Sequence, residues 1–206
     1  ARGAATGRDP WEFASTGTRP DKTLPVATVL TLAASGSETS NSCVLTNEET
    51  KEKRGITSET NRPVISFLDP ENTFTVSKFQ TGCGIVDIMM HTLERYLTPE
   101  GGESDLTDRI AEGLLIATRD AGRRAIADPR DYEARATLMW AGSVSHNDYT
   151  GCGRKRLFPV HKLEHELSAF RDEIAHGAGL SVLFPAWAEH EMQYDYPRFA
   201  QFANRV

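Results

Sequence analysis

The hydrophobic pattern changes once along the chain, close to Asp69-Pro70, and this change constrains the fold more than any other feature. Before it, apolar and β-branched residues form short runs of strand length, of which 26–34 is the longest. After it, apolar residues recur at helical spacing in five segments: 84–97, 105–126, 131–147, 158–170 and 176–192. Strands followed by helices predict an α/β unit over residues 1–75 and an all-α unit over residues 76–206.

The predicted α/β unit holds too few strands to be complete by itself. The run 26–34 is typical of a strand buried on both faces, and further strand candidates occur at 43–46 and 64–68. Three strands without crossover helices cannot make a covered parallel sheet, so we expect other residues of a longer protein to finish it. We expect residues 1–24 to be irregular and the charged stretch 47–54 to be an exposed turn.

Charge and composition exclude several classes of function. The chain has 23 Lys+Arg and 29 Asp+Glu, a formal net charge of −6, which argues against an electrostatic nucleic-acid binder. No run approaches the ~18 apolar residues of a membrane span, so we expect neither nucleic acid nor a membrane as a partner. Three cysteines without a CxxC pair argue against a disulfide framework and favour a reducing, cytoplasmic location.

Acidic and histidine side chains recur at helical spacing in the second half of the chain. Asp87 and His91 are four residues apart, and so are His161 and His165, which places each pair on one helix face. His176 follows at the start of the next helical segment. One carboxylate with several imidazoles and no thiolate suits Fe²⁺ or Zn²⁺. A single such pair is more often a surface ion pair or a helix cap, so both interpretations stay open at this point.

Several longer motifs, in their order along the chain, are similar to one enzyme family. They are 29–38 (VLTLAASGSE), 47–53 (NEETKEK), 67–70 (FLDP), 84–96 (GIVDIMMHTLERY), 139–141 (MWA) and 161–170 (HKLEHELSAF). Together they resemble the iron-containing (group III) alcohol dehydrogenases, in particular the butanol dehydrogenase and NADPH-dependent aldehyde reductase branch. The resemblance implies a dehydroquinate synthase-like fold, in which a nucleotide-binding α/β domain ends within this chain and a helical metal-binding domain follows.

The resemblance also assigns the residues of the site. It implies that the metal ligands are Asp87, His91, His161 and His176. His165 matches a further histidine that lines the family's active site, and we expect it to relay the proton. The expected contacts to NAD(H) or NADP(H) are Thr31, Leu32, Ser35, Ser37 and Lys53. Between the last two metal ligands the chain has one residue more than the family pattern, which we expect a loop at 171–174 to absorb.

The function that the resemblance implies is hydride transfer between NAD(P)H and an aldehyde or primary alcohol, and we expect a homodimer. No glycine-rich pyrophosphate loop occurs in the 206 residues. We therefore expect a central fragment, truncated at its C-terminus, that carries the metal site and half of the nucleotide site. Two alternatives remain: a dehydroquinate synthase-like lyase that uses NAD and a metal, and a non-catalytic fragment that binds no dinucleotide.

Overall fold

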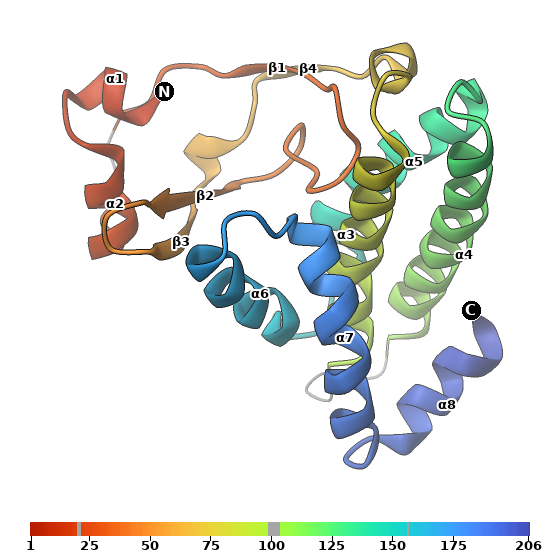
Figure 1. Ribbon diagram of the computed structural model, residues 1–206. Helices are drawn as coiled ribbons and strands as arrows, with labels where there is room; N and C mark the ends of the chain where they lie inside the picture. Colours follow the sequence, from red (N-terminus) through yellow and green to blue (C-terminus); the bar gives the residue numbers. More distant parts are fainter. Residues whose placement is uncertain (20–21, 99–103, 156) are drawn as a thin grey trace.

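A computed structural model describes residues 1–19, 22–98, 104–155 and 157–206 (Figure 1). The helices are α1 (Arg2–Thr6), α2 (Pro10–Thr16), α3 (Lys78–Tyr96), α4 (Asp105–Ala127), α5 (Tyr132–His146), α6 (Pro159–Phe170), α7 (His176–Met192) and α8 (Tyr196–Arg205). The strands are β1 (Ala27–Val29), β2 (Ser42–Asn47), β3 (Glu52–Thr57) and β4 (Ile65–Phe67). Three short 3-10 helices lie at Glu59–Asn61, Pro70–Thr73 and Tyr149–Gly151.

The strands form two small sheets. β1 pairs in parallel with β4, with Ala27 opposite Ile65, and the connection between them contains the antiparallel hairpin β2–β3. The prediction of a long buried strand over 26–34 is wrong, since only Ala27–Val29 is a strand and Val29 is 63% exposed. A pair of strands has too few neighbours to cover both of its faces, so apolar side chains such as Phe67 stay exposed despite a sequence typical of a sheet interior.

Three elements in the first 57 residues were not predicted. The charged stretch 47–54 is a turn only over 48–51, and β3 begins at Glu52, where charged residues mask the strand pattern. Residues 1–24 are not wholly irregular, because α1 and α2 form there. Asp9 caps α2 by accepting a hydrogen bond from the Trp11 N–H, and Pro10 occupies the first helical position, a start signal that the sequence contains.

All five predicted helical segments are confirmed, with small differences at their ends. α3 begins six residues earlier than predicted, at Lys78, because Ser77 accepts a hydrogen bond from the Gln80 N–H and caps the helix there. α8 was not predicted, although Asp195 caps its start. Strands therefore end at residue 67 and the long helices begin at residue 78, while a domain boundary at residue 75 stays a prediction.

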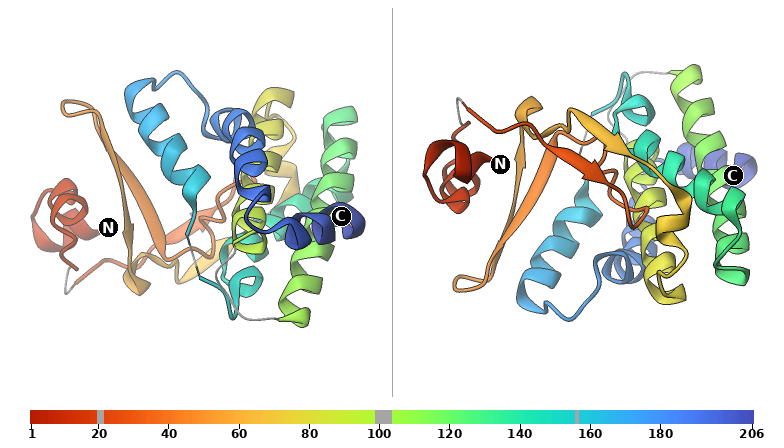
Figure 2. Two further views of the ribbon diagram at one scale, coloured as in Figure 1. Left: turned by 90° about the horizontal axis from the view of Figure 1, so that it is seen from below. Right: turned by 90° about the horizontal axis from the view of Figure 1, so that it is seen from above.

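Helix α3 lies at the centre of the helical part and packs against α4, α5 and α7 (Figure 1). The main core cluster is made of buried apolar side chains from α3, α4, α6 and α7 and from the residue after α3: Met90, Leu93, Tyr96, Leu97, Ala111, Leu115, Val160 and Leu180. The hairpin β2–β3 lies on the opposite side of the molecule from α4, and β3 contacts α6 (Figure 2). Among the described residues, no helix is long and apolar enough to cross a membrane.

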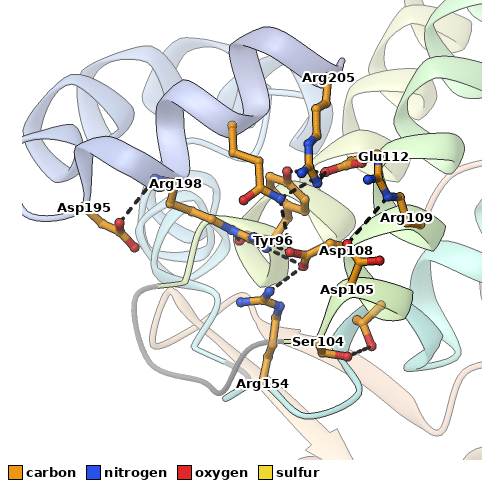
Figure 3. A network of polar contacts seen from close by, with 12 residues as sticks. Tyr96, Ser104, Asp105, Asp108, Arg109, Glu112, Arg154, Asp195, Arg198 and Arg205 are labelled. Carbon is orange, nitrogen blue, oxygen red and sulfur yellow. Dashed lines mark hydrogen bonds and ion pairs between the residues drawn. The ribbon is translucent and has the colours of Figure 1, made fainter.

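A network of buried charges attaches α8 to the rest of the helices (Figure 3). Arg198 of α8 donates two hydrogen bonds to the Asp108 carboxylate of α4, at 2.5 and 2.7 Å, and one to the Tyr96 carbonyl. Arg154 donates to the same carboxylate, and Arg205 to that of Glu112 at 3.0 Å. Arg198, Arg154 and Asp108 are buried together, whereas Arg205 is exposed, so the buried ion pairs at Asp108 hold α8 in place.

Candidate metal centre and nucleotide loop

Three of the four predicted metal ligands converge from three helices. Asp87 of α3, His161 of α6 and His176 of α7 each offer one ligand atom, and these atoms lie within 4.8 Å of one another. Asp87 Oδ1 is 3.4 Å from His161 Nε2 and 3.7 Å from His176 Nε2. Atoms that surround one ion tetrahedrally at 2.0–2.1 Å lie about 3.3–3.4 Å apart, so this spacing fits a shared divalent cation.

Unpaired polar atoms support the same interpretation. Asp87 Oδ1 and His161 Nε2 are buried, and neither has a hydrogen-bond partner in the part of the chain that the structure describes. Buried polar atoms without a partner are costly, and a bound cation would satisfy both. The residues present therefore fit a metal ion.

His91 lies beside this trio rather than within it. Its Nδ1 is 2.9 Å from the Asp87 carbonyl oxygen and 3.3 Å from Asp87 Oδ1. Its ring centroid is 4.4 Å from that of His161. The backbone hydrogen bond occupies Nδ1, so Nε2 is the nitrogen left for a ligand. The assignment of His91 as the fourth ligand stays a prediction.

Two glycines bring the start of α7 close enough for His176 to reach the trio. A Cβ atom at Gly177 would lie 2.1 Å from the Cys83 carbonyl oxygen of α3, and one at Gly179 would lie 2.8 Å from Cγ of Glu164 on α6. Only residues without a Cβ permit both approaches. Residues 171–175 form the turn between α6 and α7, and an extra residue there relative to the family pattern stays a prediction.

The charges around the centre favour an ionised aspartate. Burial opposes ionisation of Asp87, but His91, His161 and His176 together lower the pKa of its carboxyl well below the usual value. Burial also lowers the pKa of His91 far below its usual range. Burial acts the same way on His161, yet Asp87 and Glu94 outweigh it and raise the pKa of His161 to about 9.

Two carboxylates that the sequence analysis did not identify contact Nδ1 of His161 and of His176. Glu94 is 1% exposed and its Oε2 contacts His161 Nδ1, while Glu164 is fully buried and its Oε2 contacts His176 Nδ1. The signal was present, because His-x-x-Glu occurs twice, at 91–94 and at 161–164. The pairing itself was hidden, since Glu94 joins a histidine 67 positions away.

His165 lies on α6, one turn after His161, and its ring centroid is 5.4 Å from that of His176. Burial and the nearby charge of Lys53 lower the pKa of His165 to about 4. It is therefore a neutral imidazole at pH 7 and does not titrate near neutrality, which was the reason for expecting it to relay a proton. Its role in proton transfer stays a prediction.

The predicted nucleotide residues Thr31, Leu32, Ser35 and Ser37 are exposed in the loop that follows β1. This loop packs tightly on α5 and on α3, the helix that carries Asp87. Gly36 has φ +62°, and a Cβ there would lie 2.6 Å from Cβ of His146 on α5. A Cβ at Gly84 would lie 2.3 Å from the Ala33 carbonyl oxygen, so the loop rests directly on α3 one turn before Asp87.

Lys53 has a different environment from the exposed turn that was expected. It belongs to β3, and its side chain is only 18% exposed. Its Nζ donates to Ser168 Oγ of α6 at 2.8 Å and lies 3.8 Å from Glu164 Oε2. Lys53 is therefore connected to the metal centre through Glu164, and its contact with a nucleotide stays a prediction.

Comparisons with known proteins identify the family. A sequence model described as the Fe-containing alcohol dehydrogenase family, C-terminal, matches residues 81–206, and one described as iron-containing alcohol dehydrogenase matches residues 1–70. NADH-dependent butanol dehydrogenase A of Clostridium acetobutylicum is 43% identical over 187 residues, which cover 91% of this chain and 48% of that protein. NADPH-dependent aldehyde reductase YqhD of Escherichia coli is 34% identical over 199 residues, covering 96% and 51%.

A solved structure is similar over the whole chain. The crystal structure of NADH-dependent butanol dehydrogenase A from Thermotoga maritima superposes with a TM-score of 0.95 at 39% identity, covering 100% of this chain and 51% of that one. The chain spans about half the length of the curated relatives it matches. The family matches over residues 81–206 and 1–70 show that the chain belongs to the iron-containing alcohol dehydrogenase family.

Proposed function

We propose that the protein containing this chain is a metal-dependent dehydrogenase that transfers a hydride between NAD(P)H and an aldehyde or primary alcohol. The convergence of Asp87, His161 and His176 is the observation that carries the proposal. The names of the relatives, NADH-dependent butanol dehydrogenase and NADPH-dependent aldehyde reductase, support the substrate class. An alcohol of about the size of butanol, and its aldehyde, are the substrates to test.

We propose Asp87, His91, His161 and His176 as the ligands of a divalent cation, Fe²⁺ or Zn²⁺. One carboxylate with imidazoles and no thiolate is a donor set that both ions accept. When bound, such a cation supplies a Lewis acid that polarises the substrate carbonyl and stabilises negative charge on its oxygen.

The other residues of the site have complementary roles in this proposal. The exposed hydroxyl and backbone groups of Ser35 and Ser37 bind the nucleotide, with Thr31 and Leu32 before them in the loop. This loop rests on α3 at Gly84, one turn before Asp87, so the residues that would hold the nucleotide adjoin those that would hold the metal. His165, neutral at pH 7, donates a hydrogen bond or passes a proton through water to the substrate oxygen.

The proposal is tested on the intact protein, purified without oxygen or chelators. Metal content is measured by elemental analysis, and the loss of NADH or NADPH absorbance is followed with butanal. We expect one bound divalent cation and aldehyde-dependent oxidation of the cofactor. His161→Ala should lose metal and activity together while its circular dichroism stays helical.

His190→Ala is the matched control, because His190 is exposed near the end of α7, where its ring pairs with Tyr194. It should keep both metal and activity. Full metal occupancy in His161→Ala would exclude His161 as a ligand, and a metal-loaded protein that never oxidises either cofactor would refute the dehydrogenase assignment.

We also propose a homodimer in the cytoplasm. Cys43, Cys83 and Cys152 are all free thiols, which suits a reducing compartment. Size-exclusion chromatography with light scattering measures the assembly, and cell fractionation measures the location.

A further inference from the structure

We propose that Glu94 and Glu164 are positioning residues that fix which nitrogen of His161 and His176 faces the metal. The inference rests on the proposed metal centre and concerns the two carboxylates that contact the histidine ligands. In neutral imidazole one ring nitrogen carries the proton and the other is free to bind a cation. The partner of the first nitrogen therefore decides which one is the ligand.

Each of the three histidines proposed as metal ligands has its Nδ1 in contact with a different acceptor. Glu94 Oε2 contacts Nδ1 of His161, and Glu164 Oε2 contacts Nδ1 of His176. The Asp87 carbonyl oxygen lies 2.9 Å from Nδ1 of His91. Carboxylates and carbonyls without a proton can only accept, so each Nδ1 is the donor. Nε2 of His161 and of His176 then faces Asp87 Oδ1, at 3.4 and 3.7 Å.

Both carboxylates are placed rigidly enough for this role. The Glu94 side chain is fully buried, and its Oε1 accepts the Val160 N–H at 2.6 Å and the His161 N–H at 3.4 Å. These are N–H groups of the first turn of α6, where the residue before the helix, Phe158, provides no side-chain cap. Glu94 thus holds the start of α6 with one oxygen and the ring of His161 with the other.

Glu164 is different, because only one of its oxygens, Oε2, has a hydrogen-bond partner among the described residues. Oε2 contacts His176 Nδ1 and lies 3.8 Å from Lys53 Nζ. Oε1 is buried and has no hydrogen-bond partner among the residues that the structure describes. Both oxygens of Glu94 therefore accept hydrogen bonds, whereas Glu164 Oε1 accepts none from the described residues.

This difference predicts unequal effects for the same substitution at the two positions. A glutamine at 94 has one oxygen for two sets of donors, and the N–H groups of α6 can only be satisfied by that oxygen. Its NH₂ group then faces His161 Nδ1, which must accept, and the ring proton moves to Nε2 where the metal should bind. A glutamine at 164 can keep its oxygen on His176 Nδ1 and turn its NH₂ toward the unpartnered position.

The test measures Co²⁺ affinity by chelator competition, together with the visible spectrum of bound Co²⁺, in the intact protein. Glu94→Gln should bind Co²⁺ about 10–100-fold more weakly than wild type and with an altered spectrum. Glu164→Gln should lose clearly less affinity and keep the wild-type spectrum. Glu112→Gln is the matched control, since Glu112 is also a buried helical carboxylate but contacts Tyr96 and Arg205 instead of a histidine.

Several outcomes would overturn the inference. Wild-type affinity in Glu94→Gln, or equal losses in all three variants, would show that the carboxylates do not set the ligand nitrogen. If wild type takes up no Co²⁺, the metal centre itself is refuted and this inference with it. Nitrogen NMR of the Zn²⁺-loaded wild type is a second measurement that needs no variant. It should find a proton on Nδ1 of His161 and His176, and metal bound to Nδ1 of either would contradict the proposal.

Discussion

Gly177 offers a sharp test of how the metal centre is built, because the helix start next to His176 touches the backbone of α3. The Cβ of an alanine at 177 would lie 2.1 Å from the Cys83 carbonyl oxygen and 2.6 Å from its carbonyl carbon. Ordinary contact begins at 3.4 Å, so α7 and α3 must separate by about 1.3 Å. Both neighbours are main chain, and no side-chain rotation can relieve the contact.

Gly177→Ala should therefore lower stability and metal affinity together. Forcing a methyl group into such a contact costs about 1–3 kcal/mol of unfolding free energy. His176 Nε2, now 3.7 Å from Asp87 Oδ1, would move with the helix. Metal sites tolerate changes of about 0.2 Å in ligand distance, so a shift of 1 Å or more should weaken Co²⁺ binding by at least about tenfold.

Denaturant unfolding of the metal-free protein and Co²⁺ titration of the folded protein measure the two effects. Gly113→Ala is the matched control, since Gly113 is an exposed glycine within α4 where a Cβ meets nothing within 4 Å. It should raise stability by about 1 kcal/mol, as alanine does in a helix interior, and leave Co²⁺ binding unchanged. The reasoning is refuted if Gly177→Ala unfolds and binds Co²⁺ as Gly113→Ala does.

The remaining predictions concern the α8 network and Lys53. Asp108→Asn leaves the buried Arg198 without its ion-pair partner and should lower unfolding free energy by about 3–5 kcal/mol, whereas exposed Asp105→Asn should change it by less than about 1 kcal/mol. Burial raises the pKa of Asp108, but Arg198 and other donors lower it to about 2, so its contribution is present above about pH 4 and lost as pH falls toward 2. Acid titration of wild type and Asp108→Asn should therefore converge, and a constant difference down to pH 2 would contradict this. Lys53→Met should weaken NADH or NADPH binding about tenfold by calorimetry, and Lys51→Met, on the exposed hairpin turn, should not.

The sequence by itself determined the features that depend on short stretches of chain. Helical spacing located α3 to α7, and the four-residue interval placed Asp87 and His91 on one face of α3. The motifs and their order along the chain indicated the family, because each motif is a short contiguous stretch that the sequence shows directly. Local signals did not locate every element. The strand that follows the charged hairpin turn was missed, and so were α2 and α8, although the sequence contains their capping residues Asp9 and Asp195.

Tertiary structure alone decided which distant groups meet. Glu94 and His161 are 67 positions apart, and no periodicity within α3 or α6 reports that their side chains touch. The approach of α7 to α3 at Gly177 and Cys83 likewise depends on the packing of two helices, which sets His176 within reach of Asp87. Burial, and with it the pKa of His165, is also a property of the packed molecule, because a side chain loses its water only when other elements cover it.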